Sequence, residues 1–119
     1  CASVSPPGGS AGQFTYSFSR GQRFRVELYL DTYKHESTKA VFDRIHARKS
    51  ELEAKVGAIT WERIDNKRAS RIAQYHAGSI MDDAAALADL HAWAVNTMIT
   101  FYDALEPIAT EAFKEVLGT

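Results

Sequence analysis

The sequence predicts an α+β domain in which two antiparallel β-hairpins form one sheet and two long helices pack on one face of it. Segments 13–20 and 23–31 alternate apolar and polar residues with the period of two that is typical of half-buried strands, and segments 59–64 and 69–76 follow the same pattern. Each pair precedes a segment with helical spacing, first 37–56 and then the C-terminal third. The order β-β-α-β-β-α therefore indicates a sheet layer and a helix layer.

The first hairpin is predicted from two alternating rows. Its expected buried side chains are Phe14, Tyr16, Phe18, Phe24, Val26, Leu28 and Leu30. Its second strand is expected to direct outward Arg23, Arg25, Glu27 and Tyr29. Arg20-Gly21 supplies the tight turn between the strands, because glycine tolerates a positive φ.

A helix is predicted from Ser37 to about Val56. Ser37 is a suitable N-cap, because its hydroxyl can accept a hydrogen bond from the first helical turn. The apolar stripe of this helix consists of Val41, Phe42, Ile45, Leu52 and Val56. Glu51 and Lys55 are spaced for an i,i+4 ion pair, and Gly57 is expected to end the helix in a left-handed turn.

The second half repeats the plan with a hairpin of strands 59–64 and 69–76. Asp82 or Asp83 is expected to cap the long helix that follows. Its apolar stripe consists of Leu87, Leu90, Ala94, Met98, Phe101, Tyr102 and Leu105. Pro107 must kink this helix or begin a new one at its first turn.

Composition sets the domain organisation. A chain of 119 residues that is 45% hydrophobic can bury one core, which we expect in residues 13–119. Residues 1–12 are rich in Gly, Pro and Ser and are expected to be a flexible linker or tether. No membrane span is expected. The single cysteine, Cys1, fits a reducing compartment and a cytoplasmic location, and a lipid anchor on Cys1 is the alternative.

Charge is divided unevenly along the chain. Residues 1–71 hold 13 basic and 8 acidic residues, a sum of +5, whereas residues 72–119 hold 1 basic and 7 acidic residues, a sum of −6. The overall net charge of −1 conceals this division. Opposed charge on one small domain indicates an oriented contact with a charged partner or with a second copy of the chain.

The basic residues of the two hairpins are the candidate docking site. They are Arg23, Arg25, Arg63, Lys67, Arg68 and Arg71. If the hairpins lie side by side, these residues could form one cationic strip that also contains Tyr29, and such a strip suits contacts with nucleic-acid phosphates. The plainer interpretation is an ordinary charged sheet face, balanced by Glu27, Glu62 and Asp65.

The acidic last helix suggests a different partner for that strip. Its carboxylates are Asp82, Asp83, Asp89, Asp103, Glu106, Glu111 and Glu115. They could face the basic sheet of a second copy, which would give a homodimer oriented by charge.

Catalytic and metal-binding patterns are weak, so no catalytic residue, metal or cofactor is assigned. The four histidines form no ligand pair at i,i+2 or i,i+4 spacing. Glu53-Ala54-Lys55 matches half of a restriction-nuclease metal site, but within a helix residues i and i+2 point in different directions. The alternative to an interaction domain is an enzyme, either a metal-dependent nuclease or a small-molecule hydrolase, with its site near His35 and Glu36 or near His76.

Several short motifs together resemble a known family. They are Phe14 to Phe18, Val26-Glu27-Leu28-Tyr29, Lys39, Phe42-Asp43, Lys49-Ser50-Glu51-Leu52-Glu53, Gly57, Trp61-Glu62-Arg63-Ile64 and Ser70-Arg71-Ile72. In this set the chain resembles the bacterial and archaeal domain of unknown function 4268, from about Gln13 onward. That family usually forms the C-terminal part of longer proteins, some with an upstream region that looks like a restriction-type nuclease. The resemblance implies an accessory domain in a DNA-related or phage-defence setting, and it transfers no catalytic residue. From the resemblance and the basic residues together, we expect a non-enzymatic interaction domain of a longer bacterial protein that self-associates and contacts nucleic acid or a nuclease partner.

Overall fold

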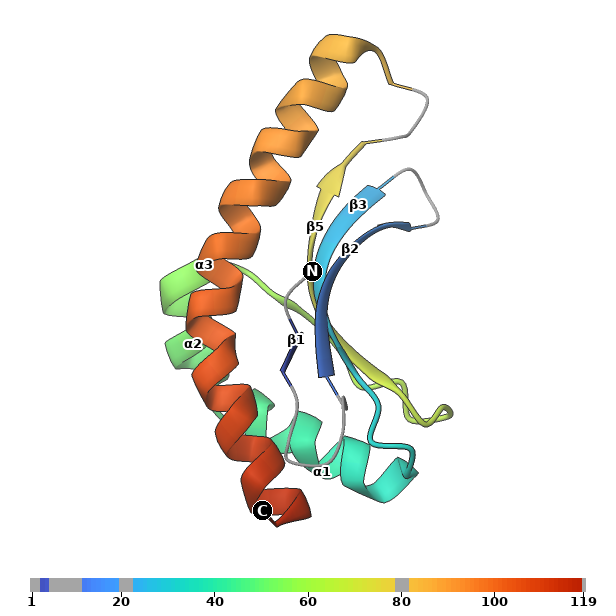
Figure 1. Cartoon of the computed structure of the whole chain (residues 1–119), viewed down its shortest axis with the longest axis vertical. Helices are drawn as coiled ribbons and strands as arrows, with labels where there is room; N and C mark the ends of the chain where they lie inside the picture. Colours follow the sequence, from blue (N-terminus) through green and yellow to red (C-terminus); the bar gives the residue numbers. More distant parts are fainter. Residues whose placement is uncertain (1–2, 5–11, 20–22, 79–81, 119) are drawn as a thin grey trace.

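A computed structural model describes residues 3–4, 12–19, 23–78 and 82–118, and it confirms the α+β class. Within these residues, the strands form one antiparallel sheet in the order β1-β2-β3-β5-β4, and the helices cover one face of it (Figure 1). The strands are β1 (Ser3–Val4), β2 (Gly12–Ser19), β3 (Arg23–Leu30), β4 (Thr60–Glu62) and β5 (Ser70–Ala77). The helices are α1 (His35–His46), α2 (Lys49–Val56) and α3 (Ala84–Leu117).

The two hairpins lie side by side because β3 pairs with β5 along its whole length. Phe14 of β2 is the register partner of Leu28, and Leu28 is the partner of Ile72. All three side chains are fully buried, so this row lies on the face that packs against the helices. The expected turn at Arg20-Gly21 lies outside the described residues, and β1 falls within the segment that was expected to be a linker.

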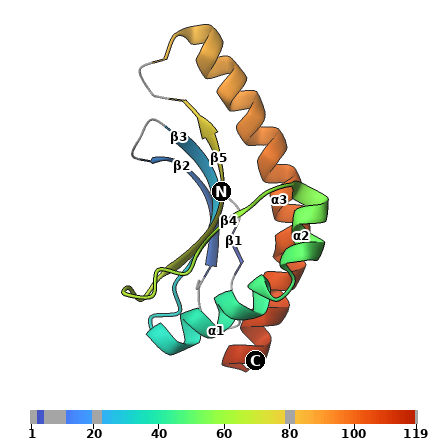
Figure 2. The same cartoon turned by 180° about the vertical axis from the view of Figure 1, so that it is seen from behind.

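The sheet is bowed, and its face away from the helices is concave (Figures 1 and 2). We call this concave surface the open face. On the other face, the ring of Phe14 meets Phe101 and Tyr102 of α3 edge-on, with ring centroids 5.9 and 4.8 Å apart. The core thus lies between the sheet and the middle and C-terminal part of α3, and α1 and α2 complete it.

The predicted helix 37–56 is divided in two, and the N-cap at Ser37 is wrong. α1 begins at His35 because Thr38 already donates its backbone N–H to Lys34 O at 3.0 Å, while its buried hydroxyl accepts from the N–H of Thr32. The chain turns at residues 47–48 and continues as α2. This turn directs α1 across the end of the sheet and α2 along α3 (Figure 2), where Leu52 becomes fully buried.

The third predicted strand is also shorter than its pattern suggested. β4 ends at Glu62, because Ile64 adopts a positive φ of 53° and the carbonyl groups of Arg63 and Ile64 accept hydrogen bonds from Lys39 of α1. The helix ends at Gly57 with a positive φ of 90°, as predicted, but its ψ of −170° is extended and differs from that of a left-handed helical turn.

The last helix is a single element that continues through Pro107, so a new helix does not begin there. Proline removes one helical hydrogen bond, and the buried residues Leu105, Ile108 and Ala109 on either side hold the helix against the core. The Asp83 cap is confirmed, since its carboxylate accepts from the N–H of Ala86 at 2.9 Å. No helix in the described part of the chain is long and apolar enough to cross a membrane.

Candidate docking surfaces

Glu27 lies near the centre of the open face, and its side chain is only 6% exposed. The sequence placed it on the correct side of the sheet, but its burial was not predicted. Its carboxylate accepts hydrogen bonds from Arg71 Nε at 2.6 Å and Ser17 Oγ at 3.2 Å, and Arg25 Nε lies 3.4 Å away. Two guanidinium groups from neighbouring strands therefore cover and neutralise one buried carboxylate.

The network extends across the open face to β4. Arg71 also donates to Glu62 at 3.0 Å, and the Tyr75 hydroxyl donates to the same carboxylate. Burial tends to lower the pKa of Arg71, but the charge of Glu27 and the hydrogen bonds to Glu27 and Glu62 outweigh it, so the pKa is raised. Burial and the hydrogen bond to Glu62 raise the pKa of Tyr75. The open face is thus held by linked ion pairs.

The loop that joins β4 to β5 is organised around Lys39, a lysine that is 4% exposed. Its ammonium group donates to the backbone oxygens of Arg63, Ile64 and Ala69 and to Ser70 Oγ, the last three at 2.8, 2.7 and 2.8 Å respectively. All four acceptors are neutral, and burial lowers the pKa of Lys39. One side chain of α1 therefore fixes the shape of a loop whose residues follow it by more than twenty positions.

This basic loop, residues 63–69, projects on the side of the open face (Figure 1) and exposes Lys67. Arg63 pairs with Asp43 at 2.9 Å and also with Asp65, and hydrogen bonds to both carboxylates raise its pKa. Arg63 is therefore oriented by carboxylates on α1 and on the loop itself.

Arg68, on the same loop, meets both the end of β3 and an exposed aromatic ring. Its guanidinium makes two hydrogen bonds of 2.8 Å to Asp31 and lies 4.9 Å from the ring centroid of Tyr33. Tyr33 is 70% exposed and has a positive φ of 67°, which is uncommon for a bulky residue. The loop and the chain after β3 thus present a cation and an aromatic ring together.

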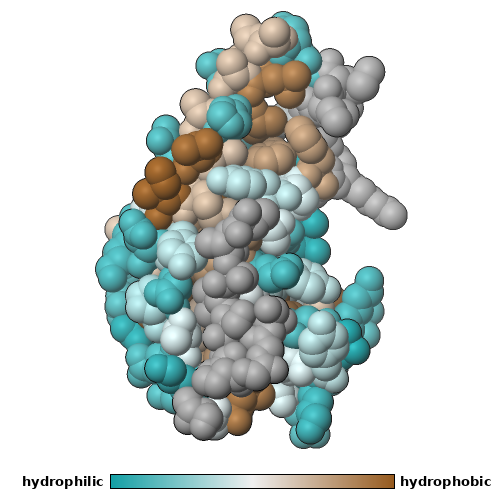
Figure 3. Space-filling view, viewed as in Figure 1, coloured by the Kyte–Doolittle hydropathy of each residue, from teal (hydrophilic) through white to brown (hydrophobic). Residues whose placement is uncertain are grey.

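The six predicted docking residues fall into two groups on this side of the molecule. Arg23, Arg25 and Arg71 lie on the open face, with Arg23 stacked 4.1 Å from the ring centroid of Tyr75. The basic loop carries Arg63, Lys67 and Arg68. Carboxylates of the same chain pair with Arg25, Arg63, Arg68 and Arg71. Figure 3 shows that this side of the molecule is hollowed, with hydrophilic side chains around the lower part of the hollow.

A third surface was missed by the sequence analysis. An apolar groove with a volume of about 320 Å³ runs between the β2–β3 hairpin and the N-terminal half of α3. Its lining residues are Tyr16, Phe18, Phe24, Leu87, Leu90, His91, Ala94 and Val95. Tyr16 and Phe18 belong to a row that the sequence predicted to be buried, and this prediction is wrong for both rings. They are exposed because α3 diverges from the sheet here. Their alternation was the signal for the correct face of β2, but it could not show that the helix leaves this face uncovered.

The two histidines considered for an enzyme site lie on different elements, His35 at the start of α1 and His76 near the end of β5. His35 Nε2 is 2.8 Å from the carbonyl oxygen of Asp65, and the ring of His76 lies 4.9 Å from that of Trp93. Glu53 accepts from the Ile59 N–H and from the Trp61 indole, so its pKa is lowered. Within the described residues, no group of three or more His, Cys, Asp or Glu side chains could hold a metal ion.

The pair between Asp31 and Arg68 should make stability depend on acid pH. The hydrogen bond from Arg68 lowers the pKa of Asp31 below its ordinary 3.8. The stabilisation is therefore complete above pH 3.8 and is lost as the pH falls through the lowered pKa of the folded state. In acid-to-neutral unfolding series, Asp31→Asn should be less stable than the wild type at neutral pH, and the difference should shrink below pH 3.8. A difference that stays constant with pH would contradict this pairing.

Comparison with protein-family models covers most of the chain. The family model described as "Domain of unknown function (DUF4268)" matches residues 6–109 of the 119-residue chain. No curated protein and no solved structure matches the chain. The match spans strands β2 to β5, α1, α2 and most of α3, and the motifs that suggested the resemblance lie within it. The chain therefore belongs to the domain of unknown function family DUF4268.

Proposed function

We propose that this chain is a non-enzymatic interaction domain that docks a single strand of nucleic acid on its basic side and associates with a second copy of itself. The observation that carries the nucleic-acid part is the basic loop. Lys39 holds it in a fixed shape, and the loop exposes Lys67 and places Arg68 beside the exposed ring of Tyr33. A preformed loop loses little conformational entropy on binding, which favours affinity.

The ion pairs of the loop are compatible with phosphate contacts. The side chains of Arg63 and Arg68 are 42% and 51% exposed, and exposed ion pairs contribute only about 0–1 kcal/mol. A phosphate group can therefore replace Asp43 on Arg63 at small cost. Asp31 is only 17% exposed and stays on Nε and one terminal nitrogen of Arg68, so a phosphate would bind the other terminal nitrogen. Arg25 and Arg71 are 17% and 20% exposed and share the buried Glu27, so they support the open face and are poor phosphate ligands.

The aromatic component favours a single strand over a duplex. An exposed tyrosine can stack on an unpaired base, which contributes about 1–3 kcal/mol per base, whereas the bases of a duplex are already stacked. Tyr33 stands next to Arg68, so one nucleotide could place its phosphate on the arginine and its base on the ring. As an accessory domain of a longer bacterial protein, this module would hold the strand for a nuclease partner.

Fluorescence anisotropy with a labelled single-stranded oligonucleotide over a salt series tests this function. The wild type should bind with a log–log salt dependence, and Lys67→Ala with Arg68→Ala should weaken binding and reduce the slope by about 1.4, at about 0.7 per lost contact. Tyr33→Ala should weaken single-strand binding without changing the slope.

The matched control is Lys49→Ala with Lys55→Ala, which removes the same charge from exposed positions of α2 in the helix layer. It should bind like the wild type. If the control and the loop variant lose affinity equally, the attraction comes from net charge and the loop is not the docking site. If the wild type does not bind at low salt, or its binding is unchanged at about 0.5 M salt, the nucleic-acid proposal fails.

A further inference from the structure

The groove lies beside a strand edge that no described strand covers. β1 pairs only with Gly12 and Gln13, which leaves the outer edge of β2 from Phe14 to Ser19 without a described partner. The eight residues of β2 contain no charge and no proline, in a chain that is 24% charged. Charged residues and prolines are the usual means of preventing edge-to-edge pairing, and β2 has neither.

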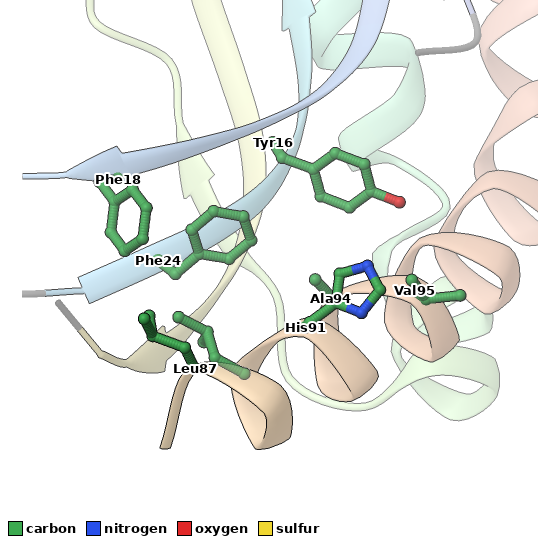
Figure 4. Close-up of a pocket in the computed structure, with 8 residues that line it drawn as sticks. Tyr16, Phe18, Phe24, Leu87, His91, Ala94 and Val95 are labelled. Atoms are coloured by element: carbon green, nitrogen blue, oxygen red, sulfur yellow. The ribbon is translucent and has the colours of Figure 1, made fainter. Parts of the chain in front are cut away.

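The surface next to this edge is apolar in both layers. In Figure 4, Tyr16, Phe18 and Phe24 extend from the sheet toward α3, where Leu87, His91 and Val95 face them. A second hollow continues the groove along α3 and is lined by Tyr16, Val95, Met98, Ile99, Tyr102 and Asp103. Ile99 is 57% exposed, so the apolar surface extends beyond the groove itself.

The exposed side of α3 carries a ridge that is complementary to its own copy. His91, Val95, Ile99 and Asp103 follow each other at i+4 spacing, and residues of this row line both hollows. The ridge has a basic group at one end, a carboxylate about 18 Å away at the other, and two aliphatic side chains between them. A two-fold axis through its middle would place His91 opposite the partner's Asp103, and Val95 opposite the partner's Ile99.

We propose that a second copy of this chain binds here through a two-fold contact, with β2 paired antiparallel to β2 of the partner and the α3 ridges packed together. This inference specifies the site of the self-association in the proposed function, and the nucleic-acid part does not depend on it. Directly opposite residues of an antiparallel pair lie on the same face, so a two-fold axis centred on Ser17 sets Tyr16 opposite the partner's Phe18. In this register, Gly12 and Gln13 remain paired with β1 of their own chain.

The open face remains accessible in this arrangement. Tyr16 and Phe18 lie on the helix-covered face of β2, whereas the register partners Ser17 and Arg25 lie on the open face. The contact is made at the strand edge and along α3, so the dimer would join two sheets into one and place two basic loops on the same assembly. If both basic loops bound the same nucleic-acid strand, the apparent affinity of the dimer for that strand would also increase.

Sedimentation equilibrium over a range of concentrations, with reductant present to keep Cys1 from cross-linking, tests the contact. The wild type should have the mass of a dimer. Ile99→Lys should weaken dimerisation by at least about 30-fold, because it sets an unpaired charge against an apolar surface of the partner. Leu117→Lys is the control: it makes the same change at an exposed apolar position near the end of the same helix, away from the groove, and should leave the dimer intact.

The two ends of the ridge allow a charge exchange. His91→Asp alone should weaken the dimer, because two carboxylates then face each other, and adding Asp103→His should restore it. A ligand site for any other partner would show no such restoration. In a Cys1→Ser background, Ser17→Cys should form an intermolecular disulfide under mild oxidation, whereas Thr60→Cys on the opposite edge should not.

The results separate the two levels of the proposal. A wild type that stays monomeric at all concentrations removes both the self-association and this contact. If the dimer tolerates Ile99→Lys, the self-association stands and the groove is not its site. The same conclusion follows if Asp103→His fails to restore the dimer of His91→Asp.

Discussion

Replacing Lys39 by Met should lower the free energy of unfolding by about 3 kcal/mol. Met preserves much of the volume of the lysine side chain but cannot donate hydrogen bonds. The carbonyl groups of Arg63, Ile64 and Ala69 and the hydroxyl of Ser70 would then lose a common donor. The Arg63 carbonyl still accepts from the Ser70 hydroxyl and the Ile64 carbonyl from a backbone N–H of the loop, so the loss falls mainly on the Ala69 carbonyl and Ser70 Oγ. Each buried acceptor left without a partner costs about 1–3 kcal/mol. Urea unfolding at neutral pH measures this loss.

Lys55→Met is the appropriate comparison, because Lys55 is exposed and makes only a 3.8 Å pair with Glu51. It should change stability by about 0.5 kcal/mol or less. Under conditions where Lys39→Met is still folded, we also expect weaker nucleic-acid binding, since the basic loop would no longer be held in one shape. Equal stability of the Lys39 and Lys55 variants would show that the loop is not held by the ammonium group.

Replacing Glu27 by Ala should cost about 3 kcal/mol of unfolding free energy. The variant leaves the guanidinium groups of Arg25 and Arg71 close together without the carboxylate that lies between them. A buried charge that loses its partner is far more costly than a surface ion pair, and here two cations lose the same partner. Glu62 remains next to Arg71 and limits the cost. Chemical denaturation of Glu27→Ala and the wild type gives the difference directly.

Glu27→Gln separates charge from packing, because it keeps the shape and one acceptor oxygen. The unfolding free energy that Glu27→Gln loses should lie between zero and the loss for Glu27→Ala. Glu51→Ala is the surface control, since Glu51 pairs with Arg48 on the exposed side of α2, and the stability of this variant should stay close to that of the wild type. A loss for Glu27→Ala as small as that of Glu51→Ala would mean that water, and not the carboxylate, neutralises the two arginines.

Local patterns predicted the elements well where a residue and its signal lie close together in sequence. The alternation of β2 and β3 gave the correct faces, and the helix cap at Asp83 and the end of the helix at Gly57 are as expected. The break between α1 and α2 escaped prediction although Arg48 and Lys49 interrupt the apolar stripe there, because the stripe resumes at Leu52 with helical spacing. A stripe records which side of a helix is buried and does not record where the chain must turn to reach its neighbour.

The docking residues were predicted by type and by strand face, and their pairing was not. Period-two alternation placed Arg23 and Arg25 in one outward row. It could not show that Arg71, which is 44 positions from Glu27, would cover that carboxylate. The same holds for Lys39, whose acceptors follow it by 24 to 31 positions. Contacts between distant segments depend on strand order and register, which local patterns do not encode.

The amino-acid order alone determined the two-layer architecture, the face of each strand that points toward the helices and the unequal distribution of charge, because each of these follows from the order and spacing of side chains along the chain. Only the tertiary structure decided which charges are buried, which loop Lys39 holds and where α3 leaves the sheet to open the apolar groove. These features arise where segments far apart in the chain meet, and their energies depend on distances and exposure that exist only in the folded molecule.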